Sequence, residues 1–135
     1  MSKHPFLVLS DLIKKYTDNK DSFDVEQLQT MREDISLQLF YLADSVGIAI
    51  SNYDKADWER KRNYSELIEK YRQETDEDGK KYTVAVVESK ARIDNKEKEL
   101  EVVEALRQKE KIRLIVSSTT HILHAISSRL NIIER

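Results

Sequence analysis

The stretch that decides the fold is residues 24–56, which read DVEQLQTMREDISLQLFYLADSVGIAISNYDKA. Its apolar residues recur at alternating three- and four-residue steps, a spacing that puts them on one face of a helix. These positions are Leu28, Met31, Ile35, Leu39, Leu42, Val46, Ala49, Tyr53 and Ala56. Asp24 is a good N-cap, and Gln27 occupies the reciprocal position of a capping box. The pattern therefore predicts a long packed helix that begins at residue 24.

The same periodicity resumes after a polar patch, so we expect this helix to run to about residue 75. Four acidic residues over 74–78 then precede Gly79. Acids near a helix C-terminus oppose its dipole, and a glycine can adopt the left-handed conformation that ends a helix. A second apolar ladder predicts another long helix over about 81–133. A short apolar stretch near the start predicts a short helix over about 8–17.

These elements predict an all-α fold. The chain has 135 residues with 2 Gly, 1 Pro and no Cys, which is too few turn-forming residues for a protein built from sheets. Two helices of about 50 residues joined by a tight turn predict a single domain, residues 1–135, shaped as a long antiparallel hairpin with a short N-terminal helix. The absence of Cys and of a long apolar run favours the cytoplasm, which is the host cytosol if the protein is phage-encoded, without membrane contact.

Two nearly charge-free segments would meet at the open end of this hairpin. Residues 36–49 contain only Asp44 as a charge, and residues 115–132 contain only Arg129. One interpretation is a core of three or four helices within one chain. The favoured one is assembly into a homo-oligomer larger than a dimer, because one short helix can hardly cover both faces. The expected interface residues are Leu39, Leu42, Val46, Ile112, Ile115, Ile122, Ile126, Leu130 and Ile133.

A cluster of cations and rings in the first long helix is a candidate nucleic-acid site. Single-stranded nucleic acid is held in this way, with cations on its phosphates and rings stacked on its bases. Basic residues of the second helix lie roughly opposite in the hairpin. The candidate residues are Trp58, Arg60, Lys61, Arg62, Tyr64, Lys90 and Arg92. The alternative is a solvated surface crossed by ion pairs such as Glu66–Lys70.

Nothing in the sequence argues for an enzyme. The chain has no phosphate-binding glycine loop and no motif of a hydrolase or a zinc protease. His121 and His124 share a helical face, but their neighbours are Ile, Leu and Thr, so we expect packing histidines. We therefore expect no catalytic residues, no metal and no cofactor.

Two short segments carry a resemblance to a known family. Ala125-Ile-Ser-Ser-Arg129, followed by Leu130 and Ile133, is similar to the Ala-Ile-x-Ser-Arg pattern of the UvsY-like phage recombination mediators. Arg60-Lys-Arg-Asn-Tyr64 is similar to that family's basic cluster followed by tyrosines.

The resemblance implies a protein that binds single-stranded DNA and assembles into a ring through its C-terminal helices. It also implies a role in helping a RecA-like recombinase displace a single-strand-binding protein. Arg60, Lys61, Arg62 and Tyr64 would contact DNA, and residues 112–133 would make the assembly. The alternative is a non-catalytic, oligomeric coiled-coil interaction protein, such as a phage adaptor or an inhibitor of a host protein. The net charge of −2 and the acidic run 74–78 favour this alternative.

Overall fold

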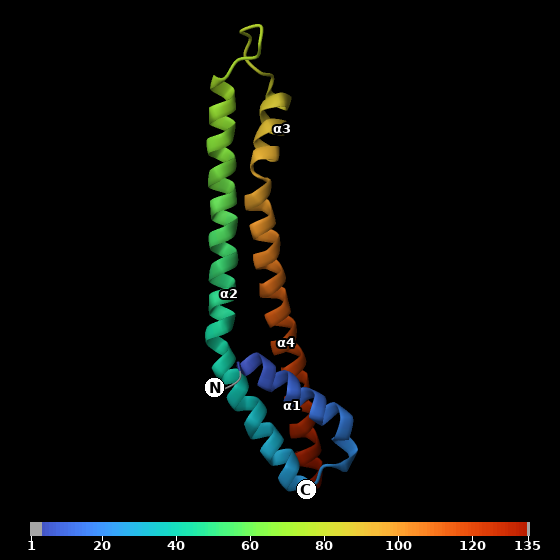
Figure 1. Cartoon of the computed structure of the whole chain (residues 1–135). Coiled ribbons are helices and arrows are strands. Elements are labelled where there is room, and N and C mark those ends of the chain that lie inside the picture. Colours follow the sequence, from blue (N-terminus) through green and yellow to red (C-terminus); the bar gives the residue numbers. More distant parts are fainter. Residues whose placement is uncertain (1–3, 135) are drawn as a thin grey trace. The chain divides into compact units, whose positions relative to one another are not determined.

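The computed structural model describes residues 4–134, which form four α-helices and one short 3-10 turn (Figure 1). The helices are α1 (Pro5–Asn19), α2 (Val25–Gln73), α3 (Val84–Asp94) and α4 (Lys96–Glu134), and the 3-10 turn η1 is Lys20–Ser22. There is no β-strand over residues 4–134, and the only bridge is an isolated one between Thr75 and Lys81. The predicted all-α class is confirmed.

The first two helices begin at residues that suit a helix start. Proline occupies the first position of α1, and the ring nitrogen Nδ1 of His4 accepts a hydrogen bond from the Phe6 N–H at 3.1 Å. The predicted capping box of α2 is confirmed, since the Gln27 N–H donates to Asp24 Oδ1 at 2.8 Å and the Asp24 N–H donates to Gln27 Oε1 at 3.0 Å. Helix α1 thus begins before the expected residue 8, whereas α2 agrees with the expected range 24–75 to within two residues at each end.

The expected continuous helix over 81–133 is wrong in one respect, because it is interrupted at Asn95. Thr83 starts α3 by accepting the Val86 N–H at 3.3 Å. Asn95 then leaves the helical conformation, with φ −89° and ψ 0°, before α4 begins. Asparagine suits such a break because its short amide can hydrogen-bond to backbone groups in place of continuing the helix.

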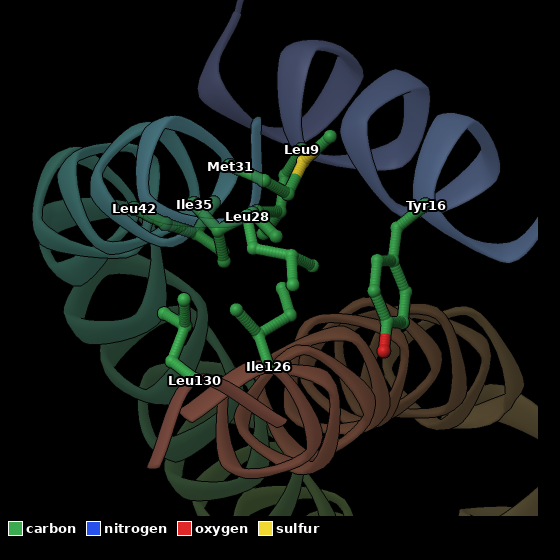
Figure 2. Packing of buried hydrophobic residues seen from close by; sticks show 8 residues of the cluster. All are labelled: Leu9, Tyr16, Leu28, Met31, Ile35, Leu42, Ile126 and Leu130. Atoms are coloured by element: carbon green, nitrogen blue, oxygen red, sulfur yellow. The ribbon is translucent and has the colours of Figure 1, made fainter. Parts of the chain in front are cut away.

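The described residues form two compact units, one of residues 4–48 with 110–134 and one of residues 49–109. The core of the first unit draws on three helices, and Figure 2 shows their side chains pointing into one cluster. The cluster is Leu9 and Tyr16 of α1, Leu28, Met31, Ile35 and Leu42 of α2, and Ile126 and Leu130 of α4. Arg129 donates a hydrogen bond to the Lys20 carbonyl oxygen, which ties α4 to η1. A helical core within one chain, one of the two interpretations of the sequence, is therefore present in this unit.

Several residues that were expected at an interface between chains belong to this core instead. Leu42, Ile126 and Leu130 have no exposed surface in the single chain, so they pack its own core. Half-buried Leu39, Val46, Ile115 and Ile122 lie against that core. Ile112 is also half-buried, and Ile133 is exposed. An interface between chains stays a prediction, and in this conformation it would use the surface that remains exposed.

The second unit is an antiparallel pair made by α2 with α3 and the first turns of α4 (Figure 1). The connecting turn contains Gly79 at φ 77°, the left-handed conformation expected from the sequence. Asp76 closes this turn, because its Oδ1 accepts the N–H groups of Asp78 and Lys80, both at 2.9 Å. A hairpin over the whole chain stays a prediction.

Truncation of a core side chain tests the first unit. Ile126→Ala is expected to lower the free energy of unfolding by about 2–5 kcal/mol, because it removes buried apolar contacts and leaves a cavity. Ile132→Ala is the matched control on the same helix, because Ile132 is 72% exposed, and a surface change of this kind costs under about 0.5 kcal/mol. Urea unfolding followed by circular dichroism measures both. Equal losses would contradict the assignment of Ile126 to the core.

Candidate nucleic-acid interface

The helix pair of the second unit contains an open hollow of about 330 Å³. Four of the residues expected to bind nucleic acid line it, namely Arg60, Lys61, Tyr64 and Arg92. Ser65, Asn95 and Glu99 complete the lining. On α2 the lining positions form two pairs four residues apart, 60 with 64 and 61 with 65, so they recur on the same side of the helix at successive turns. The hollow thus combines three cations, one ring and one carboxylate.

One carboxylate, that of Asp57, holds the two neighbouring cations. Arg60 Nη2 lies 2.7 Å from Asp57 Oδ1, and Lys61 Nζ lies 3.0 Å from Asp57 Oδ2. The hydrogen bond from Arg60, followed by that from Lys61, holds the pKa of Asp57 below its usual value. Because two cations share a single anion, the group keeps a net positive charge. Lys61 is the more available of the two, with 67% of its side chain exposed against 34% for Arg60.

Asn95 joins the two helices beside this hollow, although only 1% of it is exposed. Its Nδ2 donates to the Arg60 carbonyl oxygen at 3.2 Å, and its Oδ1 accepts from Asn63 Nδ2 at 2.6 Å. The same residue therefore ends α3 and fixes the start of α4 against the turn of α2 that carries Arg60. Asn95 positions Arg92 and Arg60 to line the same hollow. The only local sign of this role in the sequence is a gap in the apolar ladder after Ala91.

Trp58 and Arg62 do not line the hollow. The Arg62 guanidinium carbon lies 4.8 Å from the centre of the Trp58 ring, and Arg62 Nε lies 3.8 Å from Glu66 Oε1. The two residues are one helical turn apart, so the cation covers the ring in a cation–π contact. Trp58 is nevertheless 59% exposed. This pair is a second cation–ring feature on the surface of α2, outside the hollow.

Lys90 also lies outside the hollow, over two tyrosine rings. Its Nζ is 4.5 Å from the ring centre of Tyr82 and 5.6 Å from that of Tyr71. The Tyr71 hydroxyl donates a hydrogen bond to the Asp94 carboxylate. This bond is the main cause that raises the pKa of Tyr71 to about 12, because ionisation would put two negative charges together. The cluster links the end of α2 to α3.

The structure also describes the two neighbouring histidines, the groups that could hold a metal ion, and the helices that could cross a membrane. His121 and His124 are exposed, so the expectation that they pack in a helix interface is not met within this chain. Across residues 4–134 no group of three or more His, Asp or Glu side chains could hold a metal ion. No helix in that range is long and apolar enough to cross a bilayer.

The role of Asn95 leads to a stability prediction. Asn95→Ala removes both side-chain hydrogen bonds and leaves the Asn63 amide without its partner, so it is expected to cost about 1–3 kcal/mol of unfolding free energy. Asn52→Ala is the control, because Asn52 lies exposed on α2. Chemical denaturation measures the difference. A loss at position 95 no larger than at position 52 would contradict the role of Asn95 as the joint between the helices.

We compared the chain with protein-family models, with curated proteins and with solved structures. None of these is similar enough to the chain to count as a match.

Proposed function

We propose that this chain binds single-stranded DNA without catalysing a reaction, and that it acts as a phage recombination mediator in the host cytosol. Its partners would be a RecA-like recombinase and a single-strand-binding protein. The observation that carries the proposal is the hollow in which Arg60, Lys61, Arg92 and Tyr64 converge from two helices. The resemblance of residues 60–64 and 125–129 to UvsY-like mediators supports the proposed role in recombination.

The chemistry of the hollow suits a strand whose sequence is not read. The cations would hold phosphate oxygens, and Tyr64 would stack on a base, since every base has a π-face. Arg60 is bound to Asp57 through both Nε, at 3.2 Å, and Nη2, at 2.7 Å. The guanidinium is therefore oriented before a ligand arrives, which lowers the entropy cost of binding. Glu99 in the same lining would repel phosphate and keep the affinity moderate.

Moderate affinity per chain is compatible with a larger assembly. The proposal includes a hairpin along the whole chain and an oligomer of more than two chains, in which the same hollow recurs and weak contacts add up through avidity. Large apolar side chains that stay exposed in the first unit support self-association, because covering them would remove apolar surface from water. The most exposed are Leu7, Leu37, Phe40, Tyr41, Ile48, Leu114, Ile132 and Ile133.

These exposed side chains also favour the second candidate function, a non-catalytic interaction protein that docks on a host protein. Phe40 is 74% exposed and Ile132 is 72% exposed. The acidic turn that precedes Gly79 would add a negative surface for a basic partner. A measurement of binding to single-stranded DNA distinguishes the recombination mediator from the interaction protein.

The first prediction for this function concerns charge and stacking. Wild-type chain is expected to bind a dye-labelled oligo-dT, with affinity falling steeply as salt rises. Arg60→Ala with Arg92→Ala should lower the slope of log affinity against log salt by up to about 1.4, the value for two phosphate contacts on a single strand. Tyr64→Ala should cost about 1–3 kcal/mol of binding free energy with little change in slope, because stacking releases no counterions.

A matched double variant controls for the loss of charge alone. Arg107→Ala with Arg113→Ala removes two exposed arginines, which form ion pairs with Glu104 and Glu110 and do not line the hollow. It should bind nearly as wild type does. The absence of wild-type binding at low salt would contradict the DNA-binding function and favour the interaction protein.

The second prediction concerns the mediator role. In a mixture of single-stranded DNA, single-strand-binding protein and RecA-like recombinase from the same genome, the chain is expected to shorten the lag before the recombinase hydrolyses ATP. The variant with Arg60→Ala and Arg92→Ala should not shorten it, because it would hold DNA weakly. An unchanged lag with a wild-type preparation that binds oligo-dT would contradict the mediator role. It would not contradict the binding of single-stranded DNA.

A further inference from the structure

The hollow at Arg60 does not end at Tyr64. A second open hollow of about 460 Å³ shares Tyr64 and Ser65 with the first and extends along α2 to Arg72. A third, of about 100 Å³, shares Arg72 and Glu88 with the second and extends into the turn. Because each hollow shares lining residues with the next, the three adjoin one another along the helix pair, and together they are called the groove here.

The spacing of the lining residues explains why the groove is continuous. On α2 the positions 61, 65, 68 and 72 recur at three- and four-residue steps. Opposite them, across α3, Asn95 and the start of α4, the positions 84, 88, 92, 95 and 99 do the same. Each set therefore follows one side of its helix. Arg60 and Arg72 are twelve residues apart on α2, a separation of about 18 Å at 1.5 Å rise per residue.

Cations and two rings line the groove between Arg60 and Tyr82. Arg60, Lys61 and Arg92 line its first part, Tyr64 the junction with the second, and Arg72 the junction with the third. The third part adds Lys81 and Tyr82.

Three of these cations are not neutralised by a neighbour. Over the part of the chain that the structure describes, Arg72, Lys81 and Arg92 form no ion pair. Tyr82 is held in place by Lys90, whose Nζ lies 4.5 Å from its ring centre. Three carboxylates also line the groove. Glu99 lines the first part, Glu69 lines the second, and Glu88 is shared by the second and third.

We propose that the groove from Arg60 to Lys81 is one continuous track for single-stranded DNA, with Arg72, Lys81 and Tyr82 as further binding residues. At about 3.4 Å per stacked nucleotide, the roughly 18 Å from Arg60 to Arg72 accommodates about five nucleotides. This inference rests on the proposed function, because the first part of the track is the hollow that carries it. A groove that combines cations with exposed rings is the arrangement that binds single strands without reading their sequence.

A matched pair of double variants tests the track. Arg72→Ala with Lys81→Ala removes two cations that line the groove, whereas Lys70→Ala with Lys80→Ala removes two cations from neighbouring positions that do not. With a labelled dT8, the first variant should lower the salt slope by up to about 1.4 and the second should leave it nearly unchanged. An equal effect of the two variants, or none from the first, would overturn the track.

The outcome is separable from that of the proposed function. If the Arg60 and Arg92 variant loses binding while the Arg72 and Lys81 variant binds as wild type does, the strand occupies the first hollow only and the track is wrong. If the wild-type chain fails to bind dT8 at low salt, the proposed function itself is wrong.

A gain of affinity provides a measurement that a folding defect could not imitate. Glu88→Gln removes a negative charge from the middle of the groove, so it should tighten binding to dT8 several-fold at low salt. Glu97→Gln is the control, because Glu97 is exposed and does not line the groove. Tightening by both variants alike, or by neither, would overturn the path of the strand past Glu88.

Discussion

A pair of helices can bury only one side of each helix, and the two units of this chain meet that constraint differently. In the first unit α1 supplies a third helix, so that Leu9 and Tyr16 close an apolar core over α2 and α4 (Figure 2). In the second unit α3 and the start of α4 follow one another along α2, and no further helix packs across the pair. Its buried positions are few, mainly Ala49, Val87, Ala91 and Asn95. A thin apolar seam leaves long side chains and open hollows along the pair, and the candidate binding surface is a result of this incomplete covering.

Polar contacts take the place of the missing apolar core in the second unit. Asn95 bridges the helices through its amide, and Lys98 Nζ lies 3.9 Å from Glu59 Oε2 across the pair. Lys109 Nζ lies 4.5 Å from the ring centre of Tyr53. Exposed contacts of this kind contribute little individually, typically about 0–1 kcal/mol. The buried amide of Asn95 is the exception, because leaving its partners unpaired carries a desolvation penalty.

The sequence predicted what depends on local geometry and missed what depends on distant contacts. The bounds of α2 follow from its apolar periodicity and from the pairing of Asp24 with Gln27, three residues apart. The break at Asn95 depends on hydrogen bonds to residues 32 and 35 positions away, which no local pattern encodes. The burial of Ile126 and Leu130 within the chain depends on how α1 packs, so the same apolar residues were assigned to an interface between chains.

For the candidate site too, the sequence predicted the residues that are close together along the chain. Arg60, Lys61 and Tyr64 were found because they are close in sequence. Arg72 could have been found by extending their four-residue steps along α2. The contact of Arg62 with Trp58 follows from the same spacing, and it separates this ring from the hollow.

The contact of Arg62 with Trp58 bears on the intrinsic fluorescence of the protein. Trp58 is the only tryptophan in the chain, and it lies on the same stretch of α2 as the hollow. The emission of an indole depends on its exposure to water and on nearby charge. Here one cation, Arg62, lies against a ring that is otherwise 59% exposed. Tryptophan fluorescence of the unlabelled protein is therefore a local optical signal from one position on α2, rather than an average over several tryptophans.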